Sequence, residues 1–253
     1  QNVDYDMNYY LAAAYRKNGQ PAEAKKVYDA ILGLKPEEKD AYFLRGSAEL
    51  ELGDYESAKA DFDKAISMDP KNYDRLIEIY EALADYGYRE VGQEYLQNVL
   101  DTAKQLDAYD SGRIYYYLGD YQKAYLALEE AKGKGGVDSY LYLGKAYAAT
   151  GDYNYASSVY SNYLSKQGPD AEIYNQLGLC ELAKKDYQKA LEAFQAGKQI
   201  EGNSLMQTLS FNEIVAYEYL QDYQKAAVLL KAYLQNYPDD QAAIREQQFL
   251  STR

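Results

Sequence analysis

Small and large apolar residues recur along this chain in a pattern that repeats about every 34 residues. A turn sequence, Gly-Asp-Tyr or a variant of it, anchors the pattern and begins at positions 19, 53, 87, 119, 151, 185 and 221. The fifth residue after each of these positions is small, and the ninth is large and apolar. The small residues are Ala24, Ala58, Gly92, Ala124, Ala156, Ala190 and Ala226, and the large ones are Tyr28, Phe62, Leu96, Leu128, Tyr160, Phe194 and Leu230. Seven residues before the turn position, five of the seven units also have a small residue, namely Ala12, Gly46, Gly112, Gly144 and Gly178. Each unit therefore predicts two antiparallel helices, because helices approach closely where one offers a small side chain and the other a large one.

The residues around each turn predict where the helices end and begin. A glycine at the turn position adopts a positive φ without strain and so ends the first helix. An aspartate directly after it, as in Gly53-Asp54, can cap the second helix with its carboxylate. Proline does not continue a helix interior, so it marks the start of a new unit seventeen residues after the turn position, at Pro36, Pro70 and Pro238.

The period and the residues in phase with it resemble the tetratricopeptide repeat, a helix–turn–helix unit of 34 residues. The segments 41–72 and 139–166 fit that pattern almost throughout, and the resemblance extends over about residues 5–240. It implies an all-α fold, an α-solenoid with a right-handed superhelix of about seven repeats. Residues 239–253 carry apolar side chains at helical spacing among polar ones. This segment predicts a C-terminal capping helix, since the last repeat of a solenoid needs a polar outer face.

The irregular repeats lie in the middle of the chain. The third repeat has Gly92 where alanine is expected and Lys104 where proline is expected. The fourth is two residues short and ends in the glycine-rich stretch 133–136. We therefore expect one continuous solenoid with a seam near 102–110. The predicted parts are repeats one to three at 1–104, repeats four to seven at 105–238, and the capping helix at 239–253.

Composition narrows the kinds of partner. The net charge is −13, with 40 acidic against 27 basic residues. An acidic surface repels phosphate backbones and anionic lipid headgroups, so we expect no nucleic-acid partner. The same charge favours a protein or peptide segment that is neutral or basic. No apolar run is long enough to span a bilayer, so we expect no direct insertion of this chain into a membrane.

The residue types that most catalysis requires are scarce. The chain has no His and one Cys, which excludes a Cys–His nucleophile, an internal disulfide and a Cys/His zinc site. We interpret Cys180 as a buried small residue. The stretch 133–136 lacks the order of a phosphate-binding loop, and acidic pairs such as Asp61 and Asp63 lack the spacing of a calcium loop. We predict that the protein is not an enzyme and has no catalytic residue, no metal site and no cofactor.

The resemblance also implies a place for a ligand. In this family the first helix of each pair lines a concave groove in which peptides bind. Residues ten, nine and six before the turn position are expected to face that groove. The candidate binding residues are Tyr10, Phe43, Tyr109, Arg113, Tyr142, Lys145, Asn175 and Asn212. Rings supply contact area and amides pair with a peptide backbone, although the alternative is that the rings only fill space between repeats.

A carboxylate clamp is not expected in this groove. Some members of the family hold a terminal carboxylate with paired Lys and Asn residues near the N-terminal repeats. Those places hold Tyr9, Ala13 and Glu78 among others in this chain. The groove therefore favours an extended segment over a carboxylate tail.

Two functional hypotheses stay open from the sequence. The first is a non-enzymatic scaffold or adaptor that binds a protein or peptide segment in the groove. The second is a binding module of an exported bacterial lipoprotein, which assists envelope assembly or substrate capture. The composition, rich in Tyr, Asn and Gln and without His, favours an exported or cell-surface-associated bacterial protein over a cytoplasmic one. The first residue, Gln1 rather than Met, favours the same interpretation.

Overall fold

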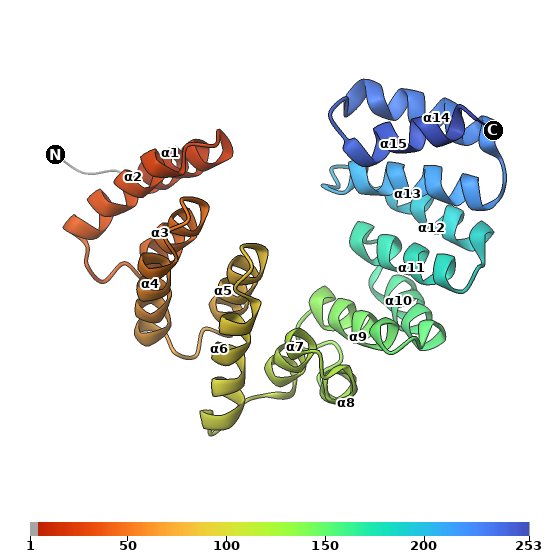
Figure 1. Ribbon diagram of the computed structural model, residues 1–253. Coiled ribbons are helices and arrows are strands. Elements are labelled where there is room, and N and C mark those ends of the chain that lie inside the picture. Colours follow the sequence, from red (N-terminus) through yellow and green to blue (C-terminus); the bar gives the residue numbers. More distant parts are fainter. Residues whose placement is uncertain (1–4, 253) are drawn as a thin grey trace. The chain divides into compact units, whose positions relative to one another are not determined.

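The computed structural model describes residues 5–252, and every regular element in that range is an α-helix (Figure 1). The helices of the first three pairs are α1 (Tyr5–Lys17), α2 (Pro21–Leu34), α3 (Lys39–Glu51), α4 (Tyr55–Met68), α5 (Tyr73–Asp85) and α6 (Arg89–Thr102). Those of the next four pairs are α7 (Ala108–Leu118), α8 (Tyr121–Glu130), α9 (Val137–Ala149), α10 (Tyr153–Gln167), α11 (Ala171–Ala183), α12 (Tyr187–Lys198), α13 (Met206–Tyr219) and α14 (Tyr223–Asn236). A single helix, α15 (Gln241–Leu250), follows them. The predicted all-α solenoid of about seven repeats with a final helix is confirmed.

The helices fall into two compact units, Gln1–Leu106 with α1–α6 and Asp107–Arg253 with α7–α15. In both units each helix packs against the next one along the chain. First helices of successive repeats also contact each other, α3 with α5 in the first unit, and α7 with α9 and α9 with α11 in the second. Side chains from the first helices of neighbouring repeats are therefore presented side by side.

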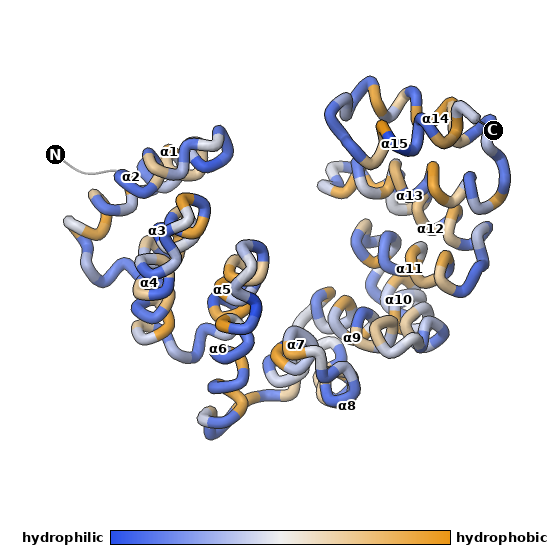
Figure 2. Tube along the Cα trace, viewed as in Figure 1, coloured by the Kyte–Doolittle hydropathy of each residue, from blue (hydrophilic) through white to orange (hydrophobic). Residues whose placement is uncertain are grey.

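The predicted contacts between small and large residues are present in the helix pairs. A Cβ added at Gly46, Gly144 or Gly178 would lie 2.8, 2.2 or 2.3 Å from the aromatic ring of the paired helix. The rings belong to Phe62, Tyr160 and Phe194, and all three side chains are fully buried. Apolar and polar residues alternate along the helices in both units (Figure 2), as expected for helices that bury one face. Glycine is thus required where the two helices of these three pairs cross.

The turns keep one geometry with and without glycine. Glycines at turn positions 19, 53, 87, 119 and 151 have φ values between 70° and 87°. Lys185 and Gln221 replace glycine in the last two turns and adopt φ values of 64° and 63°, which strain an L-residue. The aspartate after the turn accepts a hydrogen bond from the backbone N–H three residues on, at Asp54, Asp120, Asp152, Asp186 and Asp222. These caps satisfy helix N–H groups that have no partner within the helix.

Cys180 lies buried on α11, as predicted. Burial raises the pKa of its thiol to about 12, so the thiol stays protonated at neutral pH. A protonated buried thiol packs as an apolar group and is not a nucleophile. No helix within residues 5–252 is both long enough and apolar enough to cross a membrane.

Candidate functional site

Six of the eight candidate binding residues lie on successive first helices of the second unit. Tyr109 and Arg113 are on α7, Tyr142 and Lys145 on α9, Asn175 on α11 and Asn212 on α13. We call these six residues the inner row. Because α7 contacts α9 and α9 contacts α11, the row follows neighbouring helices.

At the α7 end of the inner row, Arg113 holds Tyr109 in place. The Arg113 guanidinium lies 4.3 Å from the centroid of the Tyr109 ring, and it donates a hydrogen bond to the Asp110 carboxylate. The ring of Tyr109 packs over Gly135, where an added Cβ would lie only 2.4 Å away. Arg113 itself is 7% exposed. Its charge is therefore balanced inside the protein, and it positions an aromatic ring rather than presenting a cation to solvent.

On α9, Tyr142 and Lys145 each contact a neighbouring repeat. The Tyr142 hydroxyl lies 3.0 Å from the Tyr117 hydroxyl, and its ring meets the rings of Tyr116 and Tyr117 edge-on. Lys145 Nζ lies 3.5 Å from Glu172 Oε1 on α11, with about a third of each side chain exposed. Such a half-exposed ion pair contributes little to stability, so Lys145 can exchange Glu172 for another acceptor at small cost.

Between α11 and α13, Asn175 and Asn212 form an amide pair. Asn212 Nδ2 donates to Asn175 Oδ1 at 2.9 Å, across 37 residues of sequence. Asn175 is 5% exposed, whereas Asn212 is half-buried and reaches the surface. Within residues 5–252 this is the one hydrogen bond that either side chain makes. Asn212 keeps its second amide N–H and its carbonyl oxygen for a further partner, and a peptide unit complements both groups.

The other two candidate residues belong to the first unit. Tyr10 on α1 is 75% exposed. Phe43 on α3 is half-buried, with the Arg75 guanidinium 4.1 Å from its ring centroid and the Phe62 ring centroid at 6.1 Å. Neither residue is among the contacts that link the inner row.

The sequence does not predict two residues that contact the inner row. Tyr117 contacts Tyr142 from the preceding first helix, and Glu172 opposes Lys145 from the following one. The tyrosine run 115–117 signals an unusual ring cluster, but it does not show which ring meets which repeat. Glu172 occupies a position with no repeat signature, so only the structure identifies it as the counter-charge.

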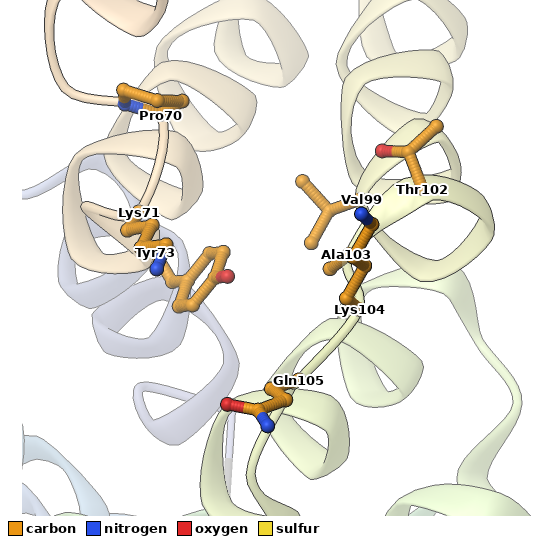
Figure 3. A pocket seen from close by; sticks show the side chains of 8 residues that line it. All are labelled: Pro70, Lys71, Tyr73, Val99, Thr102, Ala103, Lys104 and Gln105. Carbon is orange, nitrogen blue, oxygen red and sulfur yellow. The ribbon is translucent and has the colours of Figure 1, made fainter.

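A pocket of about 500 Å³ lies in the first unit, where the third repeat departs from the pattern (Figure 3). The loop before α5, the end of α6 and the residues after it form its walls. The lining residues are Pro70, Lys71, Tyr73, Val99, Thr102, Ala103, Lys104 and Gln105. Lys104, which stands where the repeat pattern expects proline, is the sequence signal for this pocket. Two of the lining residues, Lys71 and Lys104, are exposed lysines. The lining contains no pair of groups suited to acid–base chemistry.

Comparison with known proteins supports the repeat architecture. A tetratricopeptide repeat model matches residues 9–73 and 141–204, about half of the chain, and a second tetratricopeptide repeat model matches residues 211–240. The mouse protein described as FK506-binding protein-like is 42% identical over 62 residues, which are 24% of this chain and 18% of the mouse protein. The chain therefore aligns with less than a fifth of that relative's length.

Two solved structures show the same fold at low sequence identity. A tetratricopeptide repeat protein from Parabacteroides merdae has a TM-score of 0.58 at 15% identity, over 85% of both chains. Yeast Tom70 has a TM-score of 0.65 at 16% identity, over 93% of this chain and 54% of Tom70. At such identities the likeness concerns the fold and not the ligand.

Proposed function

Because the chain belongs to the tetratricopeptide repeat family, whose solenoids are protein-binding scaffolds, we propose that the inner row of the second unit binds an extended peptide segment. The amide pair of Asn175 and Asn212 is the observation that carries this proposal. It joins two repeats and keeps a donor and an acceptor available beside it. An extended peptide laid across α11 and α13 would use both groups through its own C=O and N–H.

The surroundings of the amide pair suit side chains of such a segment. Leu179, on α11, is 40% exposed, and Tyr142, on α9, is half-buried. Lys145 is the more exposed of the two cations in the inner row, and Glu172 neutralises its charge. With a net charge of −13 on the whole chain, a neutral or basic segment is favoured over an acidic one.

Peptides selected from a displayed library of random twelve-residue sequences test the proposal. The selected peptides are labelled, and their dissociation constants are measured by fluorescence polarisation for the wild type and for Asn212→Ala. Loss of the amide should weaken binding about tenfold, equivalent to about 1.4 kcal/mol. Circular dichroism confirms that the variant keeps its helix content.

Leu126→Ala supplies the matched control, because Leu126 lies on the second helix α8 and is 63% exposed. This variant should bind the selected peptides as the wild type does. If Asn212→Ala and Tyr142→Ala both bind them with wild-type affinity, the inner row is not the binding surface.

A further inference from the structure

The first helix of the chain exposes a stripe of apolar side chains. Met7, Tyr10 and Leu11 on α1 are 65%, 75% and 43% exposed, and Ala14 is exposed as well. The spacing of these four residues puts them on one face of the helix. We call them the α1 stripe.

The two ends of the α1 stripe, Met7 and Ala14, occupy positions that most other repeats use for packing between repeats. Counted back from the turn, Met7 is twelve residues before it. Four of its six equivalents are fully buried, namely Ala41, Ser139, Ile173 and Leu209, whereas Arg75 is half-buried and Asp107 is exposed. Ala14 is five residues before the turn, and five of its six equivalents are buried, namely Ala48, Ile114, Ala146, Cys180 and Ala216, while Ala82 is half-buried. Both ends of the α1 stripe thus lie at helix-packing positions of the repeat.

In four other repeats the second helix of the preceding pair covers this surface. Ile31 and Leu32 of α2 pack with Ala41 and Ala48 of α3 in one apolar cluster. The pairs α8–α9, α10–α11 and α12–α13 make the same kind of contact. A helix laid along the α1 stripe would therefore continue an interface that the chain already builds several times.

The pattern of the stripe is symmetric, which suits a second copy of the same helix. In an antiparallel pair centred between Tyr10 and Leu11, Met7 of one copy lies opposite Ala14 of the other. Tyr10 likewise lies opposite Leu11. Large residues then face smaller ones on both halves of the contact, as close helix packing requires. A two-fold axis makes the same residues serve on both sides.

The charges beside the stripe support the antiparallel arrangement. Asp6 and Lys17 stand near opposite ends of α1 and flank the stripe on the same side, by the helical period of 3.6 residues. Both are exposed, and within residues 5–252 neither forms an ion pair. In an antiparallel pair, residues on the same flank of the two copies face each other, so Asp6 of each copy comes near Lys17 of the other.

We propose that two copies of this chain associate through their α1 stripes as an antiparallel, two-fold symmetric helix pair. A contact along one helix buries much less than the roughly 1,600 Å² of a standard stable interface, so the dimer is weak. We expect a dissociation constant on the order of 100 μM, which allows the two forms to exchange with protein concentration.

Sedimentation velocity of the full chain from about 5 to 500 μM tests this proposal. The wild type should shift from monomer to dimer across that range, and Leu11→Glu should remain a monomer throughout. Leu126→Glu, at a 63% exposed position on the second helix α8, should dimerise as the wild type does. A wild type that is monomeric at the highest concentration, or a dimer that Leu11→Glu leaves intact, overturns the proposal.

Reversing the charges at Asp6 and Lys17 distinguishes this antiparallel dimer from other modes of association. Asp6→Lys and Lys17→Glu should each weaken the dimer about threefold, and the two substitutions combined should restore it, because the pairs are re-formed with reversed signs. An additive loss in the double variant contradicts the antiparallel arrangement. Since all four positions tested are exposed, far-ultraviolet circular dichroism should show unchanged helix content.

Discussion

The crossing of α11 and α12 depends on the absence of a side chain at Gly178. An alanine Cβ there would lie 2.3 Å from Phe194 Cε1 and 2.7 Å from two further ring carbons. Carbon atoms in contact sit at about 3.5–4.0 Å, so the ring or the helix must shift by more than 1 Å or so. Phe194 is fully buried, with an exposed fraction of 0%, so its ring cannot turn into solvent without losing this burial.

The expected cost follows from two opposing effects. Overpacking a well-filled core costs about 1–3 kcal/mol, while replacing glycine by alanine inside a helix gains up to about 1 kcal/mol. We therefore expect Gly178→Ala to lower the free energy of unfolding by about 1–2 kcal/mol. Urea unfolding followed by far-ultraviolet circular dichroism measures this change. Hydrogen exchange of α11 and α12 amides locates it, since repeat proteins open locally.

Gly33→Ala is the matched control, because an added Cβ at Gly33 on α2 has no neighbour within 4 Å. It should stabilise the protein by about 0.5 kcal/mol through helix propensity alone. Combining Gly178→Ala with Phe194→Leu should recover at least about 1 kcal/mol relative to the sum of the single changes, because the smaller residue removes the clash. If Gly178→Ala stabilises the protein as Gly33→Ala does, the account of close helix crossing is wrong.

Two further predictions concern the turns and the final helix. Lys185→Gly and Gln221→Gly should each stabilise the protein by about 0.5 kcal/mol, because both residues hold a positive φ of 64° or 63° that strains an L-residue; a higher urea midpoint would show it. Glu218 on α13 shares a hydrogen bond with Glu246 on α15, and desolvation with this neighbouring carboxylate raises its pKa to about 8. Since the folded state holds this proton more tightly than the unfolded chain, its contribution to stability is present at acid pH and is lost as pH rises towards 8 and beyond. Hydrogen exchange of α15 amides should therefore be several-fold faster, relative to the intrinsic rate, at pH 8.5 than at pH 5.5, and Glu246→Gln should reduce the difference; an unchanged pH response in that variant would contradict the shared proton.

The repeat pattern predicts much of the fold because the same contacts recur in phase. Gly178 and Phe194 are identified from their distances to the turn position, and the structure brings them together as expected. At Lys185 and Gln221 the repeat spacing and the following Asp-Tyr predict the turn without a glycine, and both residues adopt the positive φ. Local sequence suffices in these cases, because each contact lies within one helix–turn–helix unit.

The sequence does not predict which residues contact the candidate binding residues. The repeat phase places Arg113 on a helix face, but it does not show that Asp110 and Tyr109 engage the guanidinium and leave it buried. The bond between Asn212 and Asn175 depends on how closely two first helices approach across 37 residues. Distances between repeats are set by packing along the stack, which no local pattern encodes.

The side-chain amides of Asn212 and Asn175 provide the most direct test of peptide binding at the inner row. In the chain saturated with a library-selected peptide, nuclear magnetic resonance should show intermolecular contacts between the amide protons of this pair and backbone protons of the peptide. The same signals should shift with the concentration dependence seen by fluorescence polarisation. Amide signals that stay unmoved at saturation, with shifts confined to the second helices α8, α10 and α12, would contradict the proposed binding face.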